Sequence, residues 1–126
     1  MGLTYIGSTT VQVSDQDQAL DFYTNRLGFE PWMDQPMGEG MRWLAVRLPG
    51  AQTGIVLAKG YAESDGMGVG TFTGMVLECD DIQATHAVLS GKGVHFTEAP
   101  SLQPWGMLQA LFEDQDGNGY VLVQHA

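Results

Sequence analysis

The stretch VSDQDQALDFYTNRLGFE, residues 13–30, decides the fold because its hydrophobic pattern changes period along its length. Residues 5–13 lead into it with alternating side chains rich in β-branched types, which predicts a strand. Ser14 and Asp15 are residue types that begin helices as N-caps. From there apolar residues recur at helical spacing up to a glycine that ends the pattern. The stretch therefore predicts an amphipathic helix over residues 16–27.

A similar strand and helix recur in the second half of the chain. Residues 71–79 alternate like a strand, and Asp80 and Asp81 stand where a helix N-cap belongs. Residues 82–92 predict a second helix. The expected apolar side of this helix is Ile82, Ala87, Val88 and Leu89. Because strand, N-cap and helix repeat at about half the length of the 126-residue chain, we infer an internal duplication.

Short strand candidates follow each helix. They cover residues 29–35, 41–49 and 53–60 in the first half, and residues 94–98, 107–114 and 120–124 in the second. Residues 61–70 are rich in glycine, lack periodicity and are interpreted as a linker. The predicted fold class is therefore α+β. It consists of tandem βαβββ modules, residues 1–60 and 71–126, in one compact domain overall.

Three segments resemble the vicinal oxygen chelate superfamily, which groups glyoxalase I, extradiol dioxygenases, fosfomycin-modifying enzymes and bleomycin resistance proteins. They are residues 13–30, LECDDIQATHAVLSGKGVHF at 77–96, and LFEDQDGNGYVLVQ at 111–124. The resemblance implies a cupped mixed sheet around a ligand cavity, with the helices outside, and a homodimer. The same cup hosts isomerases, oxygenases, transferases and binding proteins, so function has to come from the cup-facing residues.

The resemblance also implies positions for metal ligands, and none of them holds a competent residue. Metal-using members carry a His on the first strand, a His or Glu near the start of the fifth, and a Glu on the last. The corresponding residues are Ser8, one of Phe72, Thr73 and Gly74, and Val121. A catalytic divalent ion needs roughly three carboxylate or imidazole ligands. We therefore expect no metal and no other cofactor.

Other metal signals are weak. The histidines, interpreted as surface or interior imidazoles, are His86, His95 and His125. Asp114, Asp116 and Asn118 resemble the opening of an EF-hand calcium loop, but the flanks are strands and no Glu stands at the twelfth position. Asp, Gly and Asn at these positions suit a tight hairpin turn, which is our interpretation.

Alternation along the strands separates a cup side from a helix side. The residues expected to face the cup or border its mouth, and to bind ligand, are Ser8, Thr10, Gln12, Trp32, Trp43, Phe72, Gly74, Val76, Trp105, Met107 and Val121. The side chains expected beside them at the mouth are Met37, Met41, Tyr61 and Met67. Aromatic rings there suit stacking on a planar ligand, and Met adapts to irregular shapes. Packing at a dimer interface is the open alternative. Trp105 is the first candidate for stacking, and Glu78 is the candidate catalytic carboxylate.

Composition narrows the partners. Asp plus Glu is 15 against 5 Lys plus Arg, a net charge of −10 that would repel nucleic acid and anionic membranes. It either attracts cationic ligands or keeps the protein soluble. No apolar run could span a bilayer and the start of the chain lacks signal-peptide features, so we expect a cytoplasmic protein. The single cysteine, Cys79, is interpreted as a small apolar filler in a strand.

Two classes of function follow. The favoured one is a metal-independent binding protein that sequesters a hydrophobic, aromatic or cationic small molecule in a cup at the dimer. The alternative is an enzyme of the lyase, isomerase or dioxygenase type, with an unrecognised metal site or with Glu78 as base. Metal analysis separates the metal-dependent case. For the cofactor-free case, Glu78→Gln should abolish turnover and leave binding largely intact.

Overall fold

The computed structural model describes residues 1–38, 40–59 and 68–124, and the chain divides into two compact units, Met1–Val69 and Gly70–Ala126. The first unit contains β1 (Ser8–Gln12), α1 (Gln16–Asp21), a π-helical turn (Phe22–Arg26), β2 (Glu30–Gly38), β3 (Met41–Arg47) and β4 (Gly54–Ala58). The second contains β5 (Phe72–Glu78), α2 (Ile82–Gly91), β6 (His95–Leu102), β7 (Leu108–Glu113) and β8 (Gly119–Gln124). The predicted βαβββ order is confirmed in both halves.

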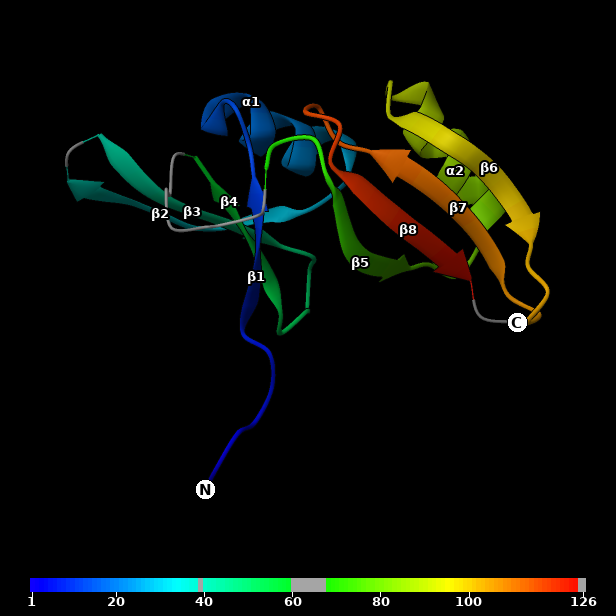
Figure 1. Ribbon diagram of the computed structural model, residues 1–126, viewed down its shortest axis with the longest axis horizontal. Helices are drawn as coiled ribbons and strands as arrows, with labels where there is room; N and C mark the ends of the chain where they lie inside the picture. The colour runs from blue at the N-terminus through cyan, green and yellow to red at the C-terminus, as the bar shows by residue number, and fades with distance from the viewer. Residues whose placement is uncertain (39, 60–67, 125–126) are drawn as a thin grey trace. The chain divides into compact units, whose positions relative to one another are not determined.

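Each unit has one four-stranded mixed sheet with the same topology (Figure 1). The strand order is β1-β4-β3-β2 in the first sheet and β5-β8-β7-β6 in the second. The first strand pairs parallel with the last, and the remaining pairs are antiparallel. This repeated topology is the structural form of the duplication seen in the sequence, and it confirms the α+β class.

The helices begin at the expected aspartates. Asp15 accepts a hydrogen bond from the Gln18 amide and Asp81 accepts one from the Ala84 amide, both at 3.0 Å. The first helix differs from the expected α-helix in its second half. From Phe22 it widens into a π-turn, in which the Leu27 amide donates to the Phe22 carbonyl. This wider turn accompanies the burial of two adjacent aromatic rings, Phe22 and Tyr23.

The expected apolar side of α2 is wrong in part. Ala87 is exposed and Val88 is 56% exposed, so neither belongs to the packed side. The spacing i, i+3, i+4, i+7 from the buried Ile82 selects instead the partly buried residues Thr85, His86 and Leu89. The His86 ring packs edge to face on Phe96 with 4.5 Å between centroids. Ring contact and helical spacing, more than residue hydrophobicity, determine which side of α2 is covered.

Strand bounds also shift: β2 continues to Gly38, beyond the expected end at residue 35, and β3 ends at Arg47, before the expected end at residue 49. β1 begins at Ser8, and the start of the chain leads away from the sheet (Figure 1), whereas the Ile6 and Gly7 carbonyls still accept hydrogen bonds from Thr53 Oγ1 and the Gly54 amide. β6 continues to Leu102, beyond the expected end at residue 98. Among the described residues, no helix is long and apolar enough to cross a membrane.

Candidate functional site

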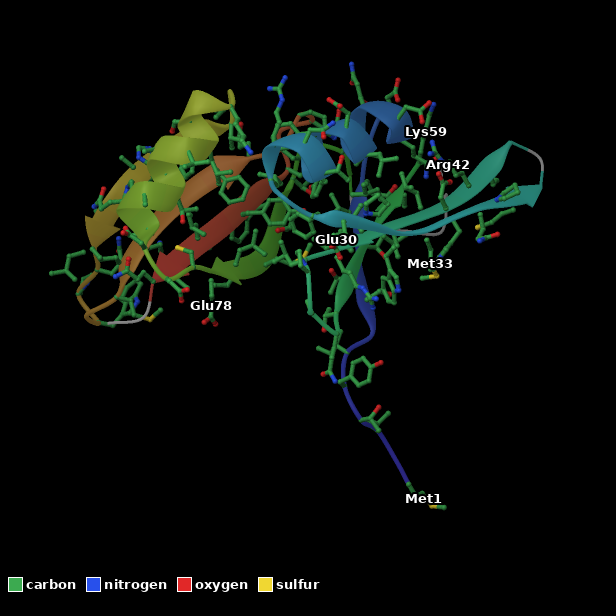
Figure 2. All side chains as sticks on the ribbon, turned by 180° about the vertical axis from the view of Figure 1, so that it is seen from behind. Met1, Glu30, Met33, Arg42, Lys59 and Glu78 are labelled. Carbon is green, nitrogen blue, oxygen red and sulfur yellow. The ribbon has the colours of Figure 1, made fainter. Side chains whose placement is uncertain are left out.

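Arg42 on β3 shows which face of the first sheet is covered by the helix. Its guanidinium bridges to Asp17 on α1 and to Asp34 on β2, both at 2.7 Å. Side chains alternate along a strand, so Trp43 and Ala45 point to the opposite face. Figure 2 shows this division, with Arg42 on the helix side of the sheet and Met33 on the other side.

Strand register extends that opposite face across the sheet. Ala45 is paired with Val56 on β4, and Val56 is paired with Thr10 on β1. The three expected cup residues of β1 therefore share the face of Trp43. Ser8 is exposed, Thr10 is half-buried and Gln12 is buried. The structure thus brings the polar row of β1 and the tryptophan of β3 to the same side of one sheet.

A β-bulge adds two further side chains to this face. The register between β2 and β3 shifts between Pro31 and Met33, so Trp32 is the extra residue. As a result Trp32 and Met33 both pack with Trp43 against small buried side chains. These are Ala45, Val56 and Ala58. We call this surface the tryptophan face, formed by Ser8, Thr10, Gln12, Trp32, Met33, Trp43, Ala45, Arg47, Gly54, Val56 and Ala58.

Arg47 and Met33 of the tryptophan face were missed by the sequence analysis. Arg47 follows Ala45 by two positions on β3, and its guanidinium lies 4.8 Å from the centroid of the Trp32 ring. Alternation from Trp43 could have placed Arg47 there. Met33 had no such signal, because the bulge changes the alternation of β2.

The second sheet has a comparable face turned away from α2. Phe72 and Val76 on β5 are 65% and 55% exposed, whereas the intervening Met75 and the following Leu77 are partly buried. The register to β8 is irregular between Phe72 and Val76, and Gly74 has a positive φ of 76° there. Val121 pairs with Val76. Glu78 is exposed at the end of β5 (Figure 2).

A shallow cavity of about 180 Å³ lies at one end of this second face. Phe72, Leu111, Glu113 and Gly119 contribute to its walls. Glu113 is a carboxylate that sequence analysis missed. Ala110 and Phe112 on β7 are buried, so alternation could have assigned Glu113 to the other face.

Trp105 and Met107 lie at the other end of the second sheet. Trp105 is 63% exposed in the turn between β6 and β7, where the Gly106 amide donates to the Gln103 carbonyl. Leu108, beside Met107, pairs with Gln124 at the end of β8, whereas Phe72 pairs with Gly119 at its start. These ends are separated by about 17 Å of strand. The structure therefore does not bring Trp105 together with Phe72.

The remaining mouth residues fall at the far end of the first sheet or outside the described residues. Met37 is 48% exposed near the end of β2, and Met41 begins β3. Tyr61 and Met67 lie outside the described residues.

No metal cluster is found within residues 1–38, 40–59 and 68–124, where no three His, Cys, Asp or Glu side chains are grouped to hold an ion. The DQDGNG segment forms the expected turn. Asp114 Oδ1 accepts from the amides of Asp116 and Asn118, and Asn118 Oδ1 accepts from the amides of Gly70 and Thr71. Asp114 Oδ1 therefore holds the turn, and Asn118 Oδ1 ties the turn to the residues just before β5. His125 lies outside the described residues.

Cys79 is partly buried next to β5. Burial raises the pKa of its thiol, which lies 3.5 Å from the Val123 carbonyl oxygen as a hydrogen-bond donor. Such a thiol is protonated at neutral pH and is a poor nucleophile.

The comparisons with known proteins agree with this architecture. The family model of the Glyoxalase/Bleomycin resistance protein/Dioxygenase superfamily matches residues 5–122. The chain belongs to this superfamily. Among curated relatives, the protein YetH of Bacillus subtilis is 36% identical over 120 residues, which cover 94% of this chain and 97% of YetH.

Two solved structures are similar over nearly their whole length. A superfamily member from Sphaerobacter thermophilus is 41% identical with a TM-score of 0.91, and the match covers 98% of each chain. TnmS3, an antibiotic binding protein from Streptomyces sp. CB03234, is 39% identical with a TM-score of 0.88, covering 100% of this chain and 99% of TnmS3.

Proposed function

We propose that the protein is a metal-independent small-molecule-binding protein of the glyoxalase/bleomycin resistance type. It sequesters a hydrophobic, aromatic or cationic ligand in a cup completed by a homodimer in the cytoplasm. The tryptophan face is the observation that carries this proposal. Its two indole rings are only partly buried over a floor of small side chains, and such rings offer a flat surface for stacking on a planar molecule.

The chemistry of this face favours binding over metal catalysis. The position implied for a histidine ligand on the first strand is Ser8, a hydroxyl residue. Flat rings and polar hydroxyl and amide groups can stack on and orient a ligand, but they do not supply the carboxylate or imidazole ligands that a divalent ion prefers. TnmS3, 39% identical to this chain, is an antibiotic binding protein, which supports the same class of function.

Titration of the purified protein with a series of planar aromatic compounds tests the proposal. We expect saturable quenching of tryptophan fluorescence with about one ligand per chain, and no change when a chelator is added. Stoichiometric Zn, Fe, Mn or Ni in the purified protein would overturn metal independence. Lack of binding across the whole series would overturn the binding function.

The homodimer is tested separately by light scattering during size-exclusion chromatography. We expect a mass about twice the 13.6 kDa of one chain, independent of ligand. A monomer at micromolar concentration that still binds ligand would remove the dimer from the proposal and leave the binding function standing.

A further inference from the structure

Arg47 is held in a fixed place on the tryptophan face. Its guanidinium stacks over the Trp32 ring at 4.8 Å, and that ring lies so close to the Gly54 backbone that any β-carbon there would clash with it. A cation fixed by stacking loses little conformational entropy when it binds an anion. The guanidinium of Arg47 is therefore preorganised to bind an anionic group.

Among the described residues, no acceptor takes a hydrogen bond from the N–H groups of Arg47. Glu30 is its register partner on β2, yet in the part of the chain that the structure describes the guanidinium makes no hydrogen bond or ion pair. Arg42, by contrast, donates hydrogen bonds to Asp17 and Asp34 on the helix side of the sheet. Arg47 is thus a cation whose donors lie beside the Trp32 indole.

We propose that Arg47 is the specificity-determining residue of the tryptophan face, selecting planar aromatic ligands that carry an anionic oxygen. The aromatic part stacks against Trp43, and the oxygen accepts charge-assisted hydrogen bonds from the guanidinium. This inference rests on the proposed binding function and narrows its ligand class. It selects anionic aromatic ligands, whereas the net charge of −10 would favour cationic ones.

Two matched dyes test it: 8-anilinonaphthalene-1-sulfonate and N-phenyl-1-naphthylamine, which share the same rings and differ by the sulfonate. Fluorescence titration should give a dissociation constant at least about tenfold lower for the sulfonate. Arg47→Gln should remove this preference, so that the ratio of the two dissociation constants falls to about one. Arg26→Gln is the matched control, because Arg26 also stacks on a ring, Phe22 at 5.7 Å, but on the helix.

The outcomes separate the two claims. Equal affinities in the wild-type protein, or a preference that survives in Arg47→Gln, would overturn the role of Arg47 while the binding function stands. If neither dye binds, the binding function itself fails. Should Arg47→Gln not fold, the Nε–H resonance of Arg47 in the wild-type protein decides. It should shift with the sulfonate dye and stay in place with the neutral one, and the reverse would overturn the proposal.

Discussion

Trp32 depends on a single glycine for its place on the tryptophan face. A β-carbon at Gly54 would clash with the Cε3 and Cζ3 atoms of the ring. Gly54 does not have a positive φ, so the cost of substitution is steric alone. We predict that Gly54→Ala lowers the free energy of unfolding by about 1–3 kcal/mol, measured by urea denaturation.

Gly7→Ala is the matched control for this substitution. Gly7 also lacks a positive φ, and nothing lies within 4 Å of its added β-carbon, so its effect should be small. Adding Trp32→Leu to Gly54→Ala should recover much of the loss, because the smaller side chain makes room. Equal effects of the two glycine substitutions would contradict the contact with Trp32.

Trp43 and Trp105 are alternative stacking residues, and their surroundings distinguish them. Trp43 is half-buried on the rigid sheet, whereas Trp105 is 63% exposed in a turn. We predict that Trp43→Leu weakens binding of N-phenyl-1-naphthylamine by about tenfold, because an ordered ring stacks at low entropic cost. Trp105→Leu should weaken it less than about threefold in the same titration. A larger effect of Trp105→Leu would move the stacking site to the turn between β6 and β7.

At this scale the sequence predicts the site only where alternation is regular. Ser8, Thr10, Gln12 and Trp43 lie on the expected face because β1 and β3 are regular there. Arg47 obeys the same alternation, but an arginine is neither a metal ligand nor an aromatic ring, so its side chain alone does not mark a ligand site. The position of Met33 depends on a bulge, which is set by pairing with another strand and leaves no local pattern to read.

Among the elements, β2, β3 and α1 are joined through one guanidinium. Hydrogen bonds from Arg42 Nε and Nη2 to both carboxylate oxygens hold the pKa of Asp34 below its ordinary value of 3.8. A lowered folded-state pKa contributes stability that is present above the unfolded value and lost as pH falls through the folded value. Because the Asp34 side chain is 48% exposed, this contribution should be only about 0.2–1 kcal/mol.

The titration of Asp34 can be followed directly by carboxyl NMR. In the wild-type protein we predict a midpoint below 3.8, and in Arg42→Gln a midpoint that rises toward that value. Arg26→Gln serves as the control and should leave the Asp34 midpoint unchanged. An unchanged midpoint in Arg42→Gln would show that another group holds the carboxylate in its charged form.

The elements themselves follow the sequence more closely than the site does. Periodicity, N-cap aspartates and glycines predicted the helices and strands, and only the ends and the π-turn differ. Hydrophobicity alone does not predict the covered side of α2, because His86 takes a packed position through its contact with Phe96 while Val88 stays exposed. The side of a helix that becomes covered is determined by the surface against which it packs, and a local sequence pattern carries no information about that surface.

For the whole molecule, the net charge has the opposite sign to the charge of Arg47 on the tryptophan face. The chain carries −10, whereas Arg47 presents a cation beside the Trp32 indole. Long-range charge acts mainly on the rate of encounter, and short-range hydrogen bonds act mainly on the rate of dissociation. The two effects can therefore be measured separately in one binding reaction.

Salt dependence of the association rate gives this measurement. Raising the salt concentration from about 0.01 M to about 0.1 M shortens the screening length from about 30 Å to about 10 Å. For 8-anilinonaphthalene-1-sulfonate in stopped-flow fluorescence, we predict that association accelerates severalfold, because repulsion by the net charge is screened. The neutral N-phenyl-1-naphthylamine should be unaffected, and a cationic planar dye such as proflavine should associate more slowly.

In Arg47→Gln the dissociation rate of the sulfonate should rise, while the effect of salt on its association rate should remain. If salt instead slowed association of the sulfonate in the wild-type protein, the field of Arg47 would dominate over that of the whole chain even at a distance.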